Sequence, residues 1–207
     1  MSEHPAKASP TTADPQPGSR GGERRQRILE AFHDCIITRG YAKTTLRDVA
    51  REAGMTASHL LYYFTGKDAI LEHYFAQVAQ RIIGRLESFR GLEPRQQIDR
   101  LSELFFAGKG ITRSEIGFML ECFGVAVHDD ILHAEKRALD RFCKGFLEEL
   151  FAQSPCGRED AGDSAELAYA MLIGLRTAAF FDNRLELSQA LRLFRSEMLS
   201  LAHFTRE

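Results

Sequence analysis

The hydrophobic and polar residues of this chain follow the spacing of amphipathic α-helices over most of its 207 positions. From about Glu23 to Arg39 the large apolar side chains recur every three or four residues, which places them on one face of a helix. Gly40 follows directly and predicts the end of that helix, because glycine readily adopts the left-handed conformation of a helix C-terminus. The predicted buried face consists of Ile28, Leu29, Ala31, Phe32, Cys35 and Ile36.

Two shorter helices are predicted next, joined by a tight turn. Thr45 and Asp48 have the spacing of a capping box, which predicts a helix start, and Gly54 ends that helix. Thr56 caps another short helix that runs to about Tyr62. Two short helices around a glycine turn form a helix-turn-helix, whose second helix can present its first turn to the major groove of double-stranded DNA.

The remaining pattern is also helical. Thr65 and Asp68 have the spacing of a second capping box, so a long helix is expected from about Gly66 to Arg90. No later segment alternates as a strand would. Five further helices are expected, at 94–107, 112–127, 130–152, 164–182 and 188–204. The predicted fold is therefore all-α, with about nine helices.

Composition divides the chain into three parts. Residues 1–22 are rich in Pro, Ser, Thr and Gly and nearly lack large apolar side chains, so they are expected to form a mobile tail. Residues 23–66 hold the helix-turn-helix, and 67–207 are expected to form a second, all-α domain. Nine basic and five acidic residues lie between Arg20 and Lys67, against seventeen and twenty-two after them. A basic first domain on an acidic body is expected of a protein in which only the first part meets phosphate; ordinary scatter in the charges is the alternative.

The stretch from residue 40 to 71 contains a glycine–aromatic start, paired threonines, an Ala-Gly turn, an aromatic pair and a Lys-acid pair: Gly40-Tyr41, Thr44-Thr45, Ala53-Gly54, Tyr63-Phe64 and Lys67-Asp68. In this order they resemble the DNA-binding signature of the TetR family of transcriptional regulators. The resemblance implies a homodimer that binds DNA through the helix-turn-helix and a small molecule in its second domain. The residue-by-residue resemblance ends near Leu71, so the role of the second domain is implied by the family and not by matching residues.

The DNA-binding residues expected from this motif lie on its two short helices and at the start of the next. The hydroxyl of Thr45 serves either capping or phosphate contact, and the ring of His59 can donate to or accept from a base edge. The commonest family pattern has a tyrosine where this chain has Leu61, so the phosphate-contacting hydroxyl is assigned to Tyr62. The expected set is Thr44, Thr45, Arg47, Thr56, Ala57, Ser58, His59, Tyr62 and Lys67.

The second domain is rich in phenylalanine, which serves either as core packing or as the wall of a ligand cavity. Collectively these rings favour a small apolar or aromatic effector, because burying apolar surface contributes about 25 cal/mol per Å². Glu121 and Arg176 interrupt apolar stretches, so they pair with each other, reach a ligand or point outward. The expected ligand-binding set is Phe75, Phe105, Phe118, Glu121, Cys122, Phe142, Phe146 and Arg176.

The last two predicted helices have wide apolar faces, which predicts a homodimer formed through them, with a place in the interior of a single chain as the alternative. The four cysteines, Cys35, Cys122, Cys143 and Cys156, are far apart and are expected to be reduced thiols, with redox sensing by Cys122 or Cys156 as the alternative. The chain has no signal peptide and no apolar run long enough to span a bilayer, so a cytoplasmic protein without membrane contact is expected.

No catalytic triad, phosphate-binding loop or metal-ligand spacing occurs, so we expect neither catalysis nor a cofactor or metal. The hypothesis from sequence is a ligand-responsive DNA-binding regulator, most simply a repressor that binds a palindromic operator. The alternative is an all-α small-molecule-binding protein that has lost DNA binding, because Leu61 stands where the commonest family pattern has a tyrosine. An enzyme in the helical body is a third hypothesis, and no residue pattern supports it.

Overall fold

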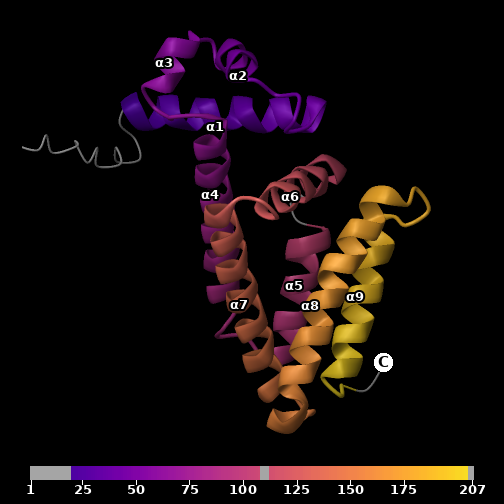
Figure 1. Cartoon of the computed structure of the whole chain (residues 1–207). Helices are drawn as coiled ribbons and strands as arrows, with labels where there is room; N and C mark the ends of the chain where they lie inside the picture. The colour runs from indigo at the N-terminus through magenta and orange to yellow at the C-terminus, as the bar shows by residue number, and fades with distance from the viewer. Residues whose placement is uncertain (1–19, 108–111, 205–207) are drawn as a thin grey trace, which may run out of the picture.

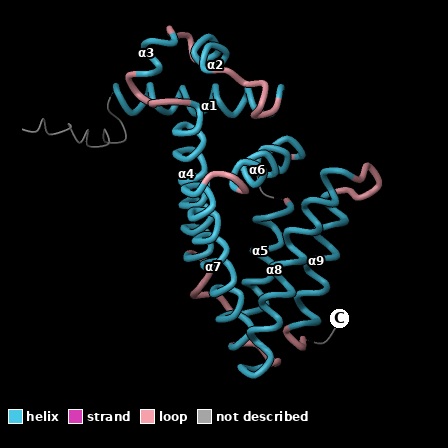
Figure 2. The backbone as a smooth tube through the Cα atoms, viewed as in Figure 1, coloured by secondary structure: helices cyan, strands magenta, loops and turns pink. Residues whose placement is uncertain are grey.

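The computed structural model describes residues 20–107 and 112–204, and within these ranges the chain forms nine α-helices and no strand (Figures 1 and 2). The helices are α1 (Arg20–Arg39), α2 (Leu46–Glu52), α3 (Ala57–Leu61), α4 (Lys67–Glu87), α5 (Pro94–Phe106), α6 (Arg113–Ala126), α7 (Asp130–Ala152), α8 (Gly157–Phe181) and α9 (Leu187–Leu201). The predicted all-α fold with about nine helices is confirmed.

Helices α1, α2 and α3 form a small head at one end of the molecule (Figure 1). All six apolar residues predicted to face inward from α1 are buried, and Leu60 of α3 is fully buried with them. Gly40 (φ +79°) and Gly54 (φ +66°) adopt the left-handed conformation at the turns after α1 and α2, where a side chain would be strained. The capping box of Thr45 and Asp48 opens α2 as predicted.

The long helix α4 runs from the head into a body built from α5 to α9 (Figure 1). Its 21 residues give it a length of about 32 Å. In the body, α7 packs against both α4 and α8, and α9 packs against α5 and α8. Helix α6 lies between the head and the body and contacts α1, α7 and α8. Both α4 and α6 therefore connect the two parts of the molecule.

Two helices begin at least three residues earlier than the sequence predicted. Helix α1 starts at Arg20, so residues 20–22 belong to it and not to the predicted tail; the rest of that tail lies outside the described residues. Helix α8 starts at Gly157, seven residues before the expected Ser164. Its first turns are polar on the outside, but their small residues Ala161 and Ala165 are buried in the core. The polar run between 154 and 163 is thus mostly the outer face of a helix.

The second predicted capping box is wrong. Gly66, not Thr65, is the N-cap of α4, and no side chain caps this helix. The carboxylate of Asp68 instead accepts a hydrogen bond from the hydroxyl of Tyr41, which follows α1. Thr65 and Asp68 have the spacing of a capping box, but the carboxylate of Asp68 binds the hydroxyl of Tyr41, a residue of the head, and not the start of α4. The helix also ends at Glu87, three residues before the expected Arg90.

Candidate functional site

The outer surface of the head is formed by the first turn of α3 and the residues that follow this helix. Thr56 caps α3 by accepting a hydrogen bond from the backbone N–H of His59 at 3.1 Å. Ser58 and His59 are exposed, while Ala57 is half-buried against the core. Tyr62 is 82% exposed and meets Tyr63 edge to face, with ring centroids 5.2 Å apart. The predicted reading residues therefore share one solvent-facing surface, backed by the buried Leu60.

The predicted DNA-binding residues before and within α2 differ in their roles: some stabilise the fold and one is free on the surface. Thr44 is only 2% exposed, and its hydroxyl donates to the carbonyl of Gly40 at 2.8 Å. This corrects its assignment as a DNA contact, because a buried hydroxyl that already stabilises the turn cannot reach a phosphate. Thr45 is exposed, but its hydroxyl forms the capping box with Asp48, whereas Arg47 is exposed. Arg47 therefore remains available for a phosphate, and Thr45 serves the cap.

Asp48 holds the start of α2 together through several hydrogen bonds. Its carboxylate accepts from the hydroxyl and the backbone N–H of Thr45 and forms ion pairs with Arg39 (2.7 Å) and Arg51 (2.8 Å). The hydrogen bonds from Thr45, helped by Arg39, lower the pKa of this carboxyl to about 2. Its ionised form is therefore stabilised by folding.

A pH dependence of stability follows from that lowered pKa. Because the carboxyl of Asp48 has a lower pKa in the folded chain, its contribution is fully present above the ordinary aspartate pKa of about 4 and is lost as pH falls towards 2. We expect Asp48→Asn to lower the melting temperature at pH 6, and the difference from wild type to shrink as pH approaches 2. Circular dichroism melts at several pH values measure this, and a pH-independent difference would contradict it.

Lys67 lies at the start of α4 and faces back to the head. Its ammonium donates to the carbonyl of Tyr41 at 2.9 Å and lies 4.0 Å from the centroid of the Tyr41 ring. Burial and the hydrogen bond to Asp68 raise the pKa of the Tyr41 hydroxyl, which stays protonated at neutral pH. Tyr41 also packs edge to face on Phe32, so it belongs mainly to the core of the head. Lys67 is thus held in place at the junction of α4 with the head.

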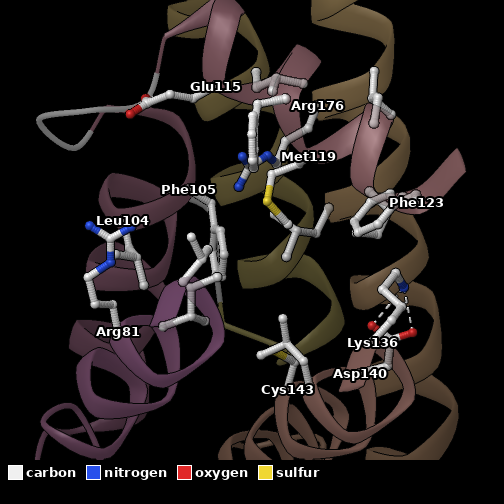
Figure 3. A pocket seen from close by; sticks show the side chains of 18 of the residues that line it. Arg81, Leu104, Phe105, Glu115, Met119, Phe123, Lys136, Asp140, Cys143 and Arg176 are labelled. Carbon is white, nitrogen blue, oxygen red and sulfur yellow. Dashed lines mark hydrogen bonds and ion pairs between the residues drawn. The ribbon is translucent and has the colours of Figure 1, made fainter. Parts of the chain in front are cut away.

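The body encloses a cavity of about 390 Å³ between α4, α5, α6, α7 and α8 (Figure 3). This volume lies within the range of about 300–1,000 Å³ that is common for small-molecule sites. Of the eight predicted ligand-binding residues, Phe105, Phe118 and Arg176 line its wall. Arg176 comes from α8 and points into the space, with its guanidinium carbon 5.6 Å from the centroid of the Phe105 ring. Burial lowers the pKa of this guanidinium, which nevertheless stays charged at neutral pH.

The other five predicted ligand-binding residues do not line this cavity. Phe75 and Phe146 are 1% exposed and belong to the core, and the Cys122 thiol is fully buried. Phe142 packs beneath the guanidinium of Arg90, 5.9 Å from the ring centroid. Glu121 lies on the side of α6 that faces the head. These assignments are corrected because adjacent turns of one helix face different neighbours, and only the packing of the helices decides which turn borders the cavity.

Sequence reasoning missed several polar residues of the cavity. Lys136 and Asp140, four residues apart on α7, form an ion pair at 2.6 Å, and Asp140 also accepts from the hydroxyl of Tyr169 on α8. Arg81 and Arg85, also four apart, are exposed side chains of α4 that line the cavity, so they mark its mouth. The sequence does contain a signal for both pairs, because side chains four residues apart lie on the same face of a helix.

One wall residue comes from the head. His33 of α1 stacks on Tyr74 of α4, with ring centroids 5.6 Å apart, and contacts the ring of Phe118 of α6 at 5.0 Å. On the next turn of α6, Glu121 accepts a hydrogen bond from the backbone N–H of Tyr41 at 3.2 Å. The wall of the cavity is therefore in direct contact with the head through α1 and through α6.

The cysteines do not have the environment of reactive thiols. Burial raises the pKa of all four, that of Cys143 to about 12, and this thiol lines the cavity. A protonated thiol is a poor nucleophile, which weakens the redox-sensing alternative for the fully buried Cys122 and for the half-buried Cys156, whose thiol donates to the carbonyl of Phe151. In the part of the chain that the structure describes, no helix combines the length and apolar character needed to cross a membrane.

A helix-turn-helix head on an all-α body is the architecture of a class of helical DNA-binding transcriptional regulators. Comparison with known families agrees with this class: residues 28–74 match the bacterial regulatory proteins of the tetR family. Residues 94–203 match the C-terminal domain described as the BetI-type transcriptional repressor. The chain belongs to the TetR family of transcriptional regulators, so it is a DNA-binding regulator and not an enzyme.

Relatives and solved structures give the same picture. The chain is 28% identical over 156 residues to the HTH-type transcriptional regulator BetI 2 of Chromohalobacter salexigens, covering 73% of this chain and 75% of that protein. It is 26% identical to PksA of Bacillus subtilis, covering 77% and 80%. A putative transcriptional regulator from Saccharomonospora viridis, solved in complex with choline, superposes with a TM-score of 0.75 at 21% identity, covering 86% and 96%. At that identity the likeness shows the shared fold.

Proposed function

We propose that this protein is a homodimeric, ligand-responsive repressor that binds a palindromic operator and releases it when a small molecule occupies the cavity of the body. The contact between the cavity wall and the head carries this proposal. Because His33 of the head is itself part of the wall, filling the cavity acts on the DNA-binding domain without an intermediate element.

The DNA contacts follow from the exposed surface of α3. His59 is the side chain proposed to contact a base edge, with Thr56, Ala57 and Ser58 lining the same approach, and Tyr62 supplies a hydroxyl to a phosphate. Arg47 and Lys67 add positive charge beside them. These assignments rest on exposure, on the orientation of the first turn of α3 and on the family to which the chain belongs.

Coupling between ligand and DNA requires that the ligand bind the DNA-incompetent arrangement more tightly. A ligand against Phe118 presses on α6, which carries Glu121 one turn further along. The nearest carboxylate oxygen of Glu121 is 3.1 Å from the point where a Cβ on Gly40 would lie, and the other accepts from the N–H of Tyr41. A shift of α6 would therefore move the hinge between α1 and α2, and with it the reading helix.

A dimer is part of the proposal because one DNA-reading head recognises one half of a palindrome, and half-sites lie about 34–36 Å apart or a multiple of this. Helix α8 leaves a stripe of apolar and small residues uncovered in the single chain, and Leu193 on α9 is 45% exposed. The stripe consists of Leu167, Ala170, Gly174, Ala178 and Phe181, spaced three or four residues apart. Pairing of α8 and α9 with those of a second copy would bury this surface.

Two variants of the reading surface test this function. Tyr62→Phe is expected to weaken binding to all DNA sequences about 2- to 10-fold, since one phosphate hydrogen bond is worth about 0.5–1.5 kcal/mol. His59→Ala is expected to weaken binding to the operator about 5- to 100-fold and to alter sequence preference at one position in each half-site, because it removes a base contact. Fluorescence anisotropy with DNA flanking the gene, and with base-substituted copies, measures both.

The control is Thr38→Ala, an exposed position on α1 whose hydroxyl bonds only to its own helix, and it should leave DNA affinity unchanged. Equal losses by His59→Ala on every sequence would refute its reading role. Absence of binding to any flanking DNA at low salt would favour the rival function, a small-molecule-binding protein without DNA affinity.

A further inference from the structure

The charges that line the cavity are predominantly positive. Four cationic side chains and two carboxylates line it, so its formal charge is +2 with His33 neutral. Lys136 is neutralised by Asp140, whose carboxylate is also bound by the hydroxyl of Tyr169. Within the described ranges, no carboxylate forms an ion pair with the guanidinium of Arg176, which contacts the face of Phe105 and points into the space (Figure 3). A cation held largely out of solvent at a cavity wall is stabilised by an anionic or polar partner in that cavity.

The second acidic residue does not meet that need. Glu115 is the acidic residue whose charge acts on Arg176, but its carboxylate accepts from the backbone N–H of Thr112 at 3.0 Å and completes the capping box of α6. Both carboxylates of the cavity are therefore committed to partners of their own chain. A cationic ligand would have to share one of these carboxylates with the partner that it already binds.

Three aromatic rings of the cavity already have a cation of the protein over them. Arg176 lies over Phe105, the ammonium of Lys136 lies 4.6 Å from the centroid of Phe123, and that of Lys144 lies 5.6 Å from Tyr169. Quaternary ammonium ligands are bound by the open faces of such rings. The protein's own cations already lie over these three rings, while Tyr74 and Phe118 pack on each other and on His33, which disfavours a choline-like ligand and leaves the apolar residues to contact an uncharged body.

We propose that the effector is an organic anion, a carboxylic acid with an apolar or aromatic body, whose carboxylate binds the fork of the Arg176 guanidinium. This inference rests on the proposed function, since it treats the cavity as the effector site. The two N–H groups of one guanidinium edge match the two oxygens of a carboxylate. Arg81 and Arg85 at the mouth raise the local concentration of such an anion. The apolar end lies among Phe118, Leu139 and Leu172, which line the same space.

Isothermal titration of the full-length protein without DNA tests the ligand class. The probes are the ω-phenylalkanoic acids with acyl chains of two to eight carbons, the neutral amide of each, and the matching phenylalkyl-trimethylammonium ions. The tightest acid is expected to bind about 10- to 100-fold more tightly than its own amide, because only the acid forms a charge-assisted pair. The ammonium ions are expected to bind more weakly than the amides.

Three variants assign that preference to one side chain. Arg176→Met should reduce the acid-to-amide ratio to about one, and Arg176→Lys should keep part of it because the charge remains without the planar fork. Arg141→Met, at an exposed position of α7 outside the cavity, should leave the ratio unchanged. A melting curve for each variant verifies folding, and Arg176→Lys carries the test if Arg176→Met does not fold.

Equal affinity for acid and amide, tighter binding of the ammonium ions, an unchanged ratio in the Arg176 variants, or no binding of any acid up to 10 mM would each overturn the inference. DNA affinity, measured separately without any probe, distinguishes this failure from failure of the proposed function. A protein that binds the operator but prefers no acid refutes only the ligand class. One that prefers acids but binds no DNA refutes only the regulatory role.

Discussion

Leu60→Ala is expected to lower the free energy of unfolding by about 2–5 kcal/mol, the range for truncating a fully buried leucine to alanine. The side chain of Leu60 has no exposed surface and packs within the core that joins α1, α2 and α3. Truncation removes apolar contacts and leaves a cavity that a small head cannot readily fill. Urea denaturation, followed by circular dichroism at one fixed protein concentration, measures the change.

The adjacent leucine provides a matched control. Leu61 is 48% exposed on the same helix, so Leu61→Ala should cost less than about 1 kcal/mol. Loss of equal size in the two variants would contradict the described orientation of α3. The same pair bears on DNA recognition, because Leu61 occupies the position where the common family pattern has a tyrosine. If Leu61→Ala leaves DNA affinity unchanged, the neighbouring Tyr62 is supported as the phosphate contact.

Leu167→Glu is expected to convert the proposed dimer into a monomer and to weaken operator binding at least 100-fold. Leu167 is 57% exposed at one end of the uncovered stripe of α8, and pairing with a second copy would place a glutamate in an apolar interface. A buried unpaired carboxylate costs several kcal/mol, and the symmetry of the dimer introduces it twice. Sedimentation equilibrium measures the mass, and anisotropy measures DNA affinity.

Ile131→Glu is the matched control, since Ile131 is 58% exposed at the start of α7, outside the proposed interface. This variant should remain a dimer and bind the operator as wild type does. A monomeric Ile131→Glu together with a dimeric Leu167→Glu would move the interface to another face of the body. A wild-type protein that is monomeric at micromolar concentration would contradict the dimer itself.

The DNA-binding part of the molecule was largely predictable because its interactions are local in sequence. The capping box of Thr45 and Asp48, the turn at Gly54 and the cap at Thr56 each involve residues within a few positions of one another. The exposure of His59 and Tyr62 beside the buried Leu60 follows from helical periodicity alone. The exception is Thr44, which is buried because the chain turns back on Gly40.

The cavity was less predictable, because its wall is assembled from six helices that lie far apart in the sequence. Hydrophobic periodicity identified the phenylalanines as inward-facing but not which of them border empty space. Phe118 lines the cavity, while Phe75 fills the core. The inclusion of His33 from the head depends on the packing of α1 against α4 and α6, which no local pattern encodes.

The sequence by itself determined the helices and the helix-turn-helix, because helical periodicity, caps and turns act over a few residues. The resemblance of residues 40–71 to the TetR signature indicated the regulator class. The tertiary structure alone decided the fate of the two charged residues that interrupt apolar helices. Glu121 and Arg176 are not paired: one binds the backbone at the head, and the other points into the cavity. The partner of a charge depends on which helices meet, and that depends on the packing of the whole chain.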